Sequence, residues 1–187
     1  EEAMFMDERE ALPKHTELLM ENGEKIILED VIGKGASSIV YQAWRLDCMG
    51  KKHKARVKEC FPAYVSVVRR GNEVVPTSGS EDEFQKAKDS FRSAYNRSVT
   101  IRNTPGLTNL TADAYELYEK NGTFYTIVSY DEGQTYEKQA DNTLKDVFEH
   151  VKAVAVAIKK YHENGYLHLD MKPENVLVIP ETKEHVI

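Results

Sequence analysis

Short runs in which apolar and polar residues alternate occupy most of the chain before residue 130. The first three runs cover residues 25–32, 39–44 and about 54–60. Two later runs, Tyr115 to Tyr118 and Phe124 to Tyr130, flank Asn121-Gly122. Alternation with a period of two is typical of strands, and Asn-Gly is the dipeptide that tight primed turns prefer. The pattern therefore predicts five antiparallel strands, of which the last two form a hairpin.

Two longer segments repeat their apolar residues at helical spacing. Asp82 to Asn103 contains neither Gly nor Pro and predicts one helix, which Pro105-Gly106 ends. A second helix is predicted by the spacing of Leu144, Val147, Phe148, Val151, Val154, Ala155 and Ile158. Asp141 or Asn142 is suited to cap its start, and Asn164-Gly165 is suited to end it.

The chain divides by composition into three parts. Residues 1–23 are mostly polar, with an apolar patch at Leu18 to Met20, and are expected to form an arm or a short helix. Residues 24–130 hold the predicted strands and the first helix, and residues 131–187 begin a mainly helical region. Within the second part, the Gly- and Pro-bearing stretch 62–80 is expected to be a mobile loop without a motif. This order of elements favours an α+β fold.

Composition narrows the class of protein. Of 187 residues, 41% are hydrophobic and 30% charged, and 25 basic against 31 acidic residues give a net charge of −6. This balance argues against nucleic acid as a partner, and no run approaches the ~20 apolar residues of a membrane helix. Cys48 and Cys60 lack the spacing of a disulfide framework or a zinc site. We expect a cytoplasmic protein with no membrane segment in this stretch.

A glycine-bearing turn joins the first two predicted strands. In Gly33-Lys34-Gly35-Ala36-Ser37-Ser38, two residues without side chains leave room for backbone amides to meet phosphate oxygens. An ordinary glycine hairpin turn is the alternative that these residues leave open. In the third strand, Lys58 is a candidate partner for a phosphate or a carboxylate, and the alternative is a solvated lysine at a sheet edge.

The stretch from Tyr166 to Leu177 carries the most specific pattern in the chain. Asp170 is followed by Lys172 two residues later and by Asn175 five residues later. Pro173 restricts the backbone between them. The spacing predicts a proton acceptor, a counter-charge for phosphate and a metal-ligating carbonyl on one loop.

Together these motifs resemble those of the eukaryotic-like Ser/Thr protein kinase family over about residues 25 to 187. Gly33 to Val40 is similar to the glycine-rich loop G-x-G-x-x-G-x-V, with Ser38 at the third glycine. His168-Leu169-Asp170 is similar to the H-R-D catalytic triplet. The resemblance implies a five-stranded antiparallel N-lobe sheet with one helix, followed by the start of a mainly helical C-lobe.

The resemblance also implies ATP and Mg²⁺ as cofactors. Asp170 would accept the proton of the substrate hydroxyl, Lys172 would face the γ-phosphoryl group, and Asn175 would ligate Mg²⁺. The nucleotide-binding residues that it implies are Gly33, Gly35, Val40, Lys58, Val128, Ser129, Tyr130 and Leu177. Among these, Val40 and Leu177 would sandwich the adenine, and Val128 would be the gatekeeper before the hinge.

Four features depart from the family pattern. Arg56 stands where an alanine usually lies beneath the adenine. The first helix lacks the glutamate that pairs with the strand-three lysine, because Tyr95 or Asn96 stands at that position. Leu169 replaces an arginine that in many kinases meets a phosphorylated activation loop. The sequence ends at Ile187, before the D-F-G aspartate that holds metal.

We expect a kinase-like domain that transfers the γ-phosphoryl group of MgATP to a protein hydroxyl, incomplete as it stands and inactive alone. Lys58, Asp170 and Asn175 favour this enzyme, whereas the departures favour a pseudokinase-type interaction module with weak or no turnover. A small-molecule kinase is a third alternative, which the run from Lys172 to Asn175 disfavours. The expected partners are a protein substrate and a second copy of the chain, through the apolar helix at 144–158.

Overall fold

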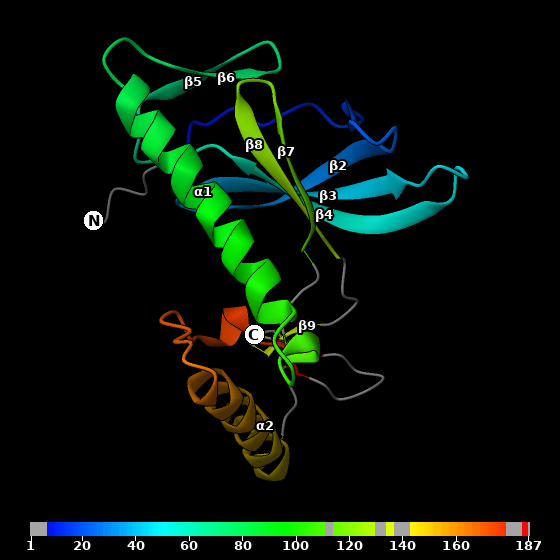
Figure 1. The fold of residues 1–187 in the computed structure, drawn as a ribbon, viewed down its shortest axis with the longest axis vertical. Helices are drawn as coiled ribbons and strands as arrows, with labels where there is room; N and C mark the ends of the chain where they lie inside the picture. The colour runs from blue at the N-terminus through cyan, green and yellow to red at the C-terminus, as the bar shows by residue number, and fades with distance from the viewer. Residues whose placement is uncertain (1–6, 111–113, 130–133, 137–142, 179–184, 187) are drawn as a thin grey trace. The chain divides into compact units, whose positions relative to one another are not determined.

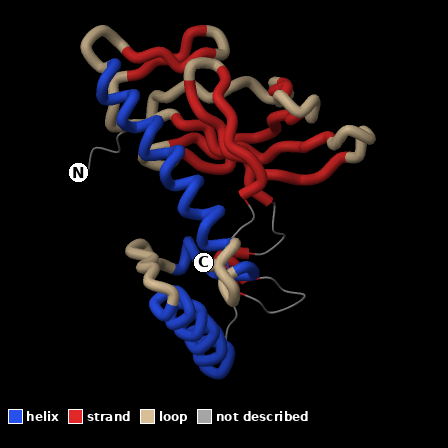
Figure 2. Tube along the Cα trace, viewed as in Figure 1, coloured by secondary structure: helices blue, strands red, loops and turns tan. Residues whose placement is uncertain are grey.

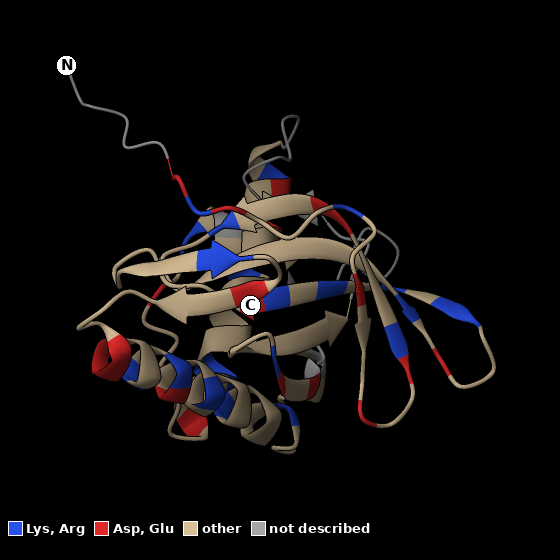
Figure 3. Ribbon diagram, turned by 90° about the horizontal axis from the view of Figure 1, so that it is seen from above, with Lys and Arg blue, Asp and Glu red and all other residues tan. Residues whose placement is uncertain are grey.

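The computed structural model describes residues 7–110, 114–129, 134–136, 143–178 and 185–186. The chain forms two compact units, one from residues 1–96 and 114–130 and the other from residues 97–113 and 131–187. Figure 2 shows that the long strands belong to the first unit. Lys and Arg residues are interspersed with Asp and Glu residues along the ribbon (Figure 3).

The first unit is built on a six-stranded sheet with the order β1-β2-β3-β4-β8-β7 (Figure 1). All its neighbouring strands are antiparallel. The strands are β1 (Glu17–Leu19), β2 (Lys25–Lys34), β3 (Ser38–Leu46), β4 (Lys52–Cys60), β7 (Ala114–Lys120) and β8 (Thr123–Ser129). The predicted α+β class and the five predicted strands are confirmed, although most of the strands extend beyond the predicted bounds.

The sixth strand, β1, comes from the arm that precedes the predicted sheet. Leu18 pairs with Ile26 of β2, and both side chains are buried. Met20 is buried as well. The alternative of a short helix in the arm is therefore wrong, because the apolar patch completes the buried face of the sheet as a strand.

The stretch 62–80, expected to be a mobile loop, contains a β-hairpin. Its strands are β5 (Val67–Arg70) and β6 (Glu73–Pro76), which pair antiparallel. Gly71 has a φ of 60°, a conformation that glycine adopts without strain. The expectation of a loop is wrong, because the residues on either side of Gly71-Asn72 pair with one another instead of remaining open.

The remaining elements of the first unit agree with the pattern of the sequence. Helix α1 (Glu81–Arg102), whose residues up to Asn96 belong to the first unit, begins with an acidic first turn and buries Phe84 and Ala87. Its predicted range is confirmed to within one residue at each end. Asn121 and Gly122 have φ values of 53° and 71°, as the predicted primed turn between β7 and β8 requires.

The second unit contains α2 (Leu144–Glu163), which ends at Asn164 with Gly165 in the left-handed region, as predicted. Thr143 is its N-cap and forms a capping box with Asp146. The predicted caps, Asp141 and Asn142, are wrong for this reason, and both lie outside the described residues.

Short elements complete the second unit. The 3₁₀ helices are η1 (Thr108–Leu110) and η3 (Pro173–Asn175). The strands β9 (Gln134–Thr135), β10 (Leu177–Val178) and β11 (His185–Val186) form a small sheet in the order β11-β10-β9. Along α2, Ala157 and Tyr161 are buried, whereas Leu144 and Phe148 of the predicted apolar stripe are 81% and 75% exposed. Association through this stripe stays a prediction.

Candidate functional site

The turn between β2 and β3 presents unpaired amides. The Gly35 N–H donates to the Ser38 carbonyl at 2.9 Å and closes the two-residue turn Ala36-Ser37. From the segment after β4, the Phe61 N–H donates to the Ser37 carbonyl at 3.2 Å. Within the described ranges, the N–H groups of Ala36 and Ser37 donate to no protein acceptor. The tip of this turn therefore offers two free donors to an anion.

The fold does not require glycine at the two positions that flank this turn. Gly33 and Gly35 do not have positive φ angles. A Cβ added at Gly33 would meet no atom within 4 Å, and at Gly35 the nearest atom, the Ser38 carbonyl oxygen, would be 3.9 Å away. The segment is a hairpin turn, as the alternative has it, and the backbone conformation of this turn requires glycine at neither position. The space beside the backbone is open at Gly33, and at Gly35 an added Cβ would make only an ordinary van der Waals contact, so both positions leave room that a bound group can use.

One cross-strand row brings three of the predicted residues together. Gly33 of β2 pairs with Val40 of β3, Val40 pairs with Lys58 of β4, and Lys58 pairs with Thr126 of β8. Directly paired residues lie on the same face of a sheet, and neighbouring strands are about 4.8 Å apart. The next row on this face pairs Arg56 with Val128. Four of the predicted nucleotide-binding residues, Gly33, Val40, Lys58 and Val128, thus share one face.

Lys58 lies on this face without an acidic partner. Surrounding protein lowers the pKa of its ammonium by desolvation, although part of the side chain remains accessible, and the positive charge of Arg56 lowers the pKa further. Among the described residues, no carboxylate forms a salt bridge with Lys58. Asp89 of α1 instead pairs with Arg92 at 2.7 Å. An ammonium in this setting favours an anionic ligand.

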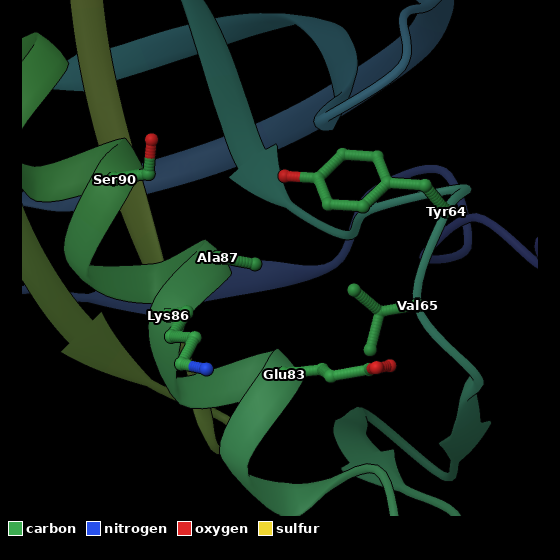
Figure 4. Close-up of a pocket in the computed structure, with 6 residues that line it drawn as sticks. All are labelled: Tyr64, Val65, Glu83, Lys86, Ala87 and Ser90. Carbon is green, nitrogen blue, oxygen red and sulfur yellow. The ribbon is translucent and has the colours of Figure 1, made fainter.

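The position of Glu83, one of three acids in the first turn of α1, is consistent with this. Glu83 lines a pocket of about 320 Å³ between α1 and the segment that follows β4. Figure 4 shows it with Lys86 and Ala87 of the same helix, opposite Tyr64 and Val65. Neither Glu83 nor Asp89 forms a salt bridge with Lys58 in the structure. That Tyr95 or Asn96 faces Lys58 stays a prediction.

In the second unit, a strained turn precedes the predicted catalytic carboxylate. Leu169 has a φ of 57°, and the Asp170 N–H donates to the His168 carbonyl at 2.7 Å. This hydrogen bond spans two residues and defines a γ-turn centred on Leu169. Leucine rarely adopts a positive φ, and such strain is concentrated at functional sites. The ring of His168 meets that of Tyr161 edge-on at 6.5 Å, which ties the turn to α2.

Asp170, Lys172 and Asn175 form one cluster, as the sequence predicts. Asn175 Nδ2 donates to Asp170 Oδ2 at 2.9 Å and to the Asp170 backbone carbonyl at 2.8 Å. Lys172 Nζ lies 3.5 Å from Asp170 Oδ2. Within the described part of the chain, Asp170 Oδ1 and Asn175 Oδ1 accept no hydrogen bond. One oxygen is thus open for a hydroxyl proton and the other for a hard cation.

The structure gives the positions of other predicted nucleotide-binding residues but does not test their roles. Ser129 is buried at the end of β8, where it pairs with Ala55. Leu177 pairs with Thr135 and Val186 in the small sheet. Tyr130 lies outside the described residues. The adenine contacts of these residues stay predictions.

Sequence reasoning missed a buried charge on the opposite face of β4. Glu59 is fully buried and accepts hydrogen bonds from Tyr41 Oη and Tyr125 Oη, each at 2.7 Å. Arg69 of β5 completes the set, with Nη2 at 2.6 Å from Glu59 Oε2. The signal was present, since Ala55, Val57 and Glu59 alternate on one strand face, which places a carboxylate among apolar residues.

The described residues were also considered as possible metal ligands and as possible membrane-spanning helices. Within the ranges that the structure describes, no three His, Cys, Asp or Glu side chains lie close enough together to hold a metal ion. No described helix is both long and apolar enough to cross a membrane.

Known proteins share this architecture. No protein-family model matches the chain. The solved structure of PpkA-294 in its apo form is similar, with a TM-score of 0.72 and 22% identity, over 94% of this chain and 60% of that one. The kinase domain of PF14_0431 is similar with a TM-score of 0.63 and 18% identity, over 91% of this chain and 43% of that one. The chain thus spans about half the length of these proteins, and its fold is protein kinase-like.

Proposed function

We propose that the chain carries the ATP-binding and catalytic-loop portion of a protein kinase that transfers the γ-phosphoryl group of MgATP to a Ser or Thr hydroxyl. The observation that carries this proposal is the cluster of Asp170, Lys172 and Asn175 behind the γ-turn at Leu169. A strained backbone that holds a carboxylate, an ammonium and an amide together is suited to positioning reactants.

Each side chain of the cluster would have its own role in phosphoryl transfer. Asp170 Oδ2 is occupied by Asn175 and Lys172, so its Oδ1 is the oxygen that would accept the proton of the incoming hydroxyl. Asn175 Oδ1 would ligate Mg²⁺, which neutralises phosphate charge when bound. Lys172 would stabilise the charge on the transferred group. The roles of Asp170 and Asn175 use oxygens that the internal contacts of the cluster leave available, whereas Lys172 Nζ also lies 3.5 Å from Asp170 Oδ2.

The first unit would hold the phosphates of the nucleotide. The free amides of Ala36 and Ser37 would donate to phosphate oxygens, and the lack of a side chain at Gly35 would let these oxygens approach. Lys58 would then acquire the anionic partner that it lacks within the protein. Its lowered pKa is consistent with this role, because a bound phosphate would favour the charged form that desolvation disfavours.

Replacing Asp170 tests the catalytic part of the proposal. In the protein that carries this sequence at full length, Asp170→Asn should lower ATP-dependent phosphorylation of a protein acceptor about 100-fold or more, because the amide cannot take up a proton. Asp30→Asn is the matched control, since Asp30 is an exposed carboxylate that pairs only with Lys14. Equal activity of the Asp170→Asn and Asp30→Asn variants would contradict the proposal.

One observation favours a second candidate, a kinase-like module that binds partners without turnover. Lys58 has no acidic partner among the described residues of α1, and a partner of this kind holds the lysine for catalysis in kinases. The two candidates differ in a direct measurement. Binding of MgATP by wild-type protein with no phosphorylation above that of Asp170→Asn would establish the second candidate.

A further inference from the structure

The arm that precedes the sheet contacts the glycine turn through side chains that the proposed function does not use. Arg9 Nη2 donates to the Gly35 carbonyl at 2.8 Å, and Arg9 Nη1 donates to the Phe61 carbonyl. In return, Lys34 Nζ donates to the carbonyls of Arg9 at 2.6 Å and Asp7 at 3.2 Å. Four hydrogen bonds therefore join the arm to Lys34, Gly35 and Phe61.

The Arg9 side chain is itself held in place. Its Nε donates to Asp7 Oδ1 at 2.9 Å, and only 9% of the side chain is exposed. These hydrogen bonds from Arg9 lower the pKa of Asp7 to about 2, so the pair is ionised at neutral pH. Because the Asp7 charge balances that of Arg9, what the guanidinium contributes is its rigid set of donors.

Those donors bridge the two segments that shape the turn. Gly35 belongs to the turn, and Phe61 follows β4 and donates its own N–H to the Ser37 carbonyl. Arg9 also occupies the Gly35 carbonyl oxygen, a group that would repel a phosphate. The groups that the tip still presents are the unpaired amides of Ala36 and Ser37.

We propose that Arg9 is a positioning residue that fixes the turn from Gly35 to Ser38 in its phosphate-receiving conformation before nucleotide binds. The effect on nucleotide affinity rests on the proposed function, whereas the effect on the turn does not. The arm has other anchors, since Leu12 is buried and its N–H donates to Tyr41 Oη at 3.0 Å. Removal of the Arg9 side chain thus leaves the rest of the arm in place.

Hydrogen exchange on the nucleotide-free protein tests the effect on the turn. In Arg9→Ala, the amides of Gly35, Phe61 and Ala63, which bond within or to the turn, should exchange about tenfold faster. Arg9→Lys should restore little of this protection, because one ammonium cannot reproduce the planar set of donors that the guanidinium offers. The matched control is Lys14→Ala, which removes an arm cation that pairs with Glu29 and Asp30 instead.

Calorimetry with MgATP on the same variants tests the consequence. Arg9→Ala should weaken MgATP binding about threefold to tenfold, since the turn has its phosphate-receiving conformation in a smaller fraction of the molecules. Lys14→Ala should bind MgATP as the wild type does. Unchanged exchange at the turn, faster exchange throughout the sheet, or unchanged affinity despite a loosened turn would each overturn the proposal. If the wild type itself binds no MgATP, the proposed function fails, and the exchange data still decide whether Arg9 orders the turn.

Discussion

Lys58 and Glu59 are neighbours on β4, and their side chains lie on opposite faces of the sheet. Glu59 is fully buried, and Tyr41, Tyr125 and Arg69 all bond to it. Lys58 is partly accessible, and desolvation lowers its pKa with no acid among the described residues to compensate. A buried charge with a complete set of partners holds a fold together, whereas a poorly compensated charge at an accessible face is a place for a ligand.

The largest effect is expected from removal of Arg69, the cation that pairs with the buried Glu59 carboxylate. Arg69→Leu should lower the free energy of unfolding by about 3–5 kcal/mol, because it leaves the Glu59 carboxylate buried without a counter-charge. Urea unfolding of the variant measures the loss. Arg70→Leu, at the exposed neighbouring position, is the control and should stay within about 0.5 kcal/mol of the wild type. Similar losses in both variants would remove the distinction between the faces.

Removing one neutral donor should cost less. Tyr125→Phe deletes the hydroxyl that donates to Glu59 Oε1 at 2.7 Å, and hydrogen bonds to charged groups contribute about 1.5–3 kcal/mol. We expect a loss in this range, measured by the same urea unfolding. A variant as stable as the wild type would show that Tyr41 and Arg69 satisfy the carboxylate without Tyr125.

On the opposite face, Lys58→Met should change binding more than stability. Its affinity for MgATP should fall about tenfold or more, because a hydrogen-bonded charge pair with phosphate is lost. Calorimetry measures this, and Lys52→Met, at the exposed start of β4, is the control. Equal affinities in wild type and Lys58→Met would take Lys58 out of the phosphate site.

The same variant should alter the pH dependence of stability. Because the folded-state pKa of Lys58 lies below its usual value of 10.5, the native state binds fewer protons than the unfolded state between the two values. The free energy of unfolding of wild type, minus that of Lys58→Met, should therefore rise as pH increases through this window toward 10.5. A difference that stays flat or falls with pH would show that Lys58 is not desolvated.

The smallest expected effect concerns the glycines. Gly35→Ala should change stability by no more than about 0.5 kcal/mol, because the added Cβ makes only an ordinary van der Waals contact, 3.9 Å from the Ser38 carbonyl oxygen, and the φ of Gly35 is not positive. Gly122→Ala is the contrasting variant, since its φ is +71° and the Cβ would lie 2.8 Å from the Val74 carbonyl oxygen. Thermal unfolding should therefore distinguish the two variants. A loss at Gly35 as large as at Gly122 would show that the turn needs glycine for the fold.

Strong local patterns made most of the fold predictable. Helices α1 and α2 and the hairpin at Asn121-Gly122 have long periodic segments or specific turn residues, and all three are confirmed. Strands β5 and β6 have only four residues each, and the Gly71-Asn72 signal between them was attributed to a loop. Strand β1, with three residues, is too short for alternation to show.

The site was predictable where its residues lie close together in sequence. Asp170, Lys172 and Asn175 fall on one loop, so their spacing determines that they meet. Arg69, the cationic partner of Glu59, lies on an unpredicted hairpin. Arg9 donates to Gly35, which is 26 residues away along the chain. Pairings of this kind depend on tertiary packing, which no local pattern encodes.

The buried carboxylate of Glu59 also has a consequence for how the sheet folds. Its partners Arg69, Tyr41 and Tyr125 are 10, 18 and 66 residues away along the chain. Any intermediate that buries Glu59 before Tyr125 arrives has a charge that is only partly satisfied, which raises its free energy. Partly folded forms of the sheet are disfavoured as a result, and β4, β5 and β8 are expected to form in a single cooperative transition.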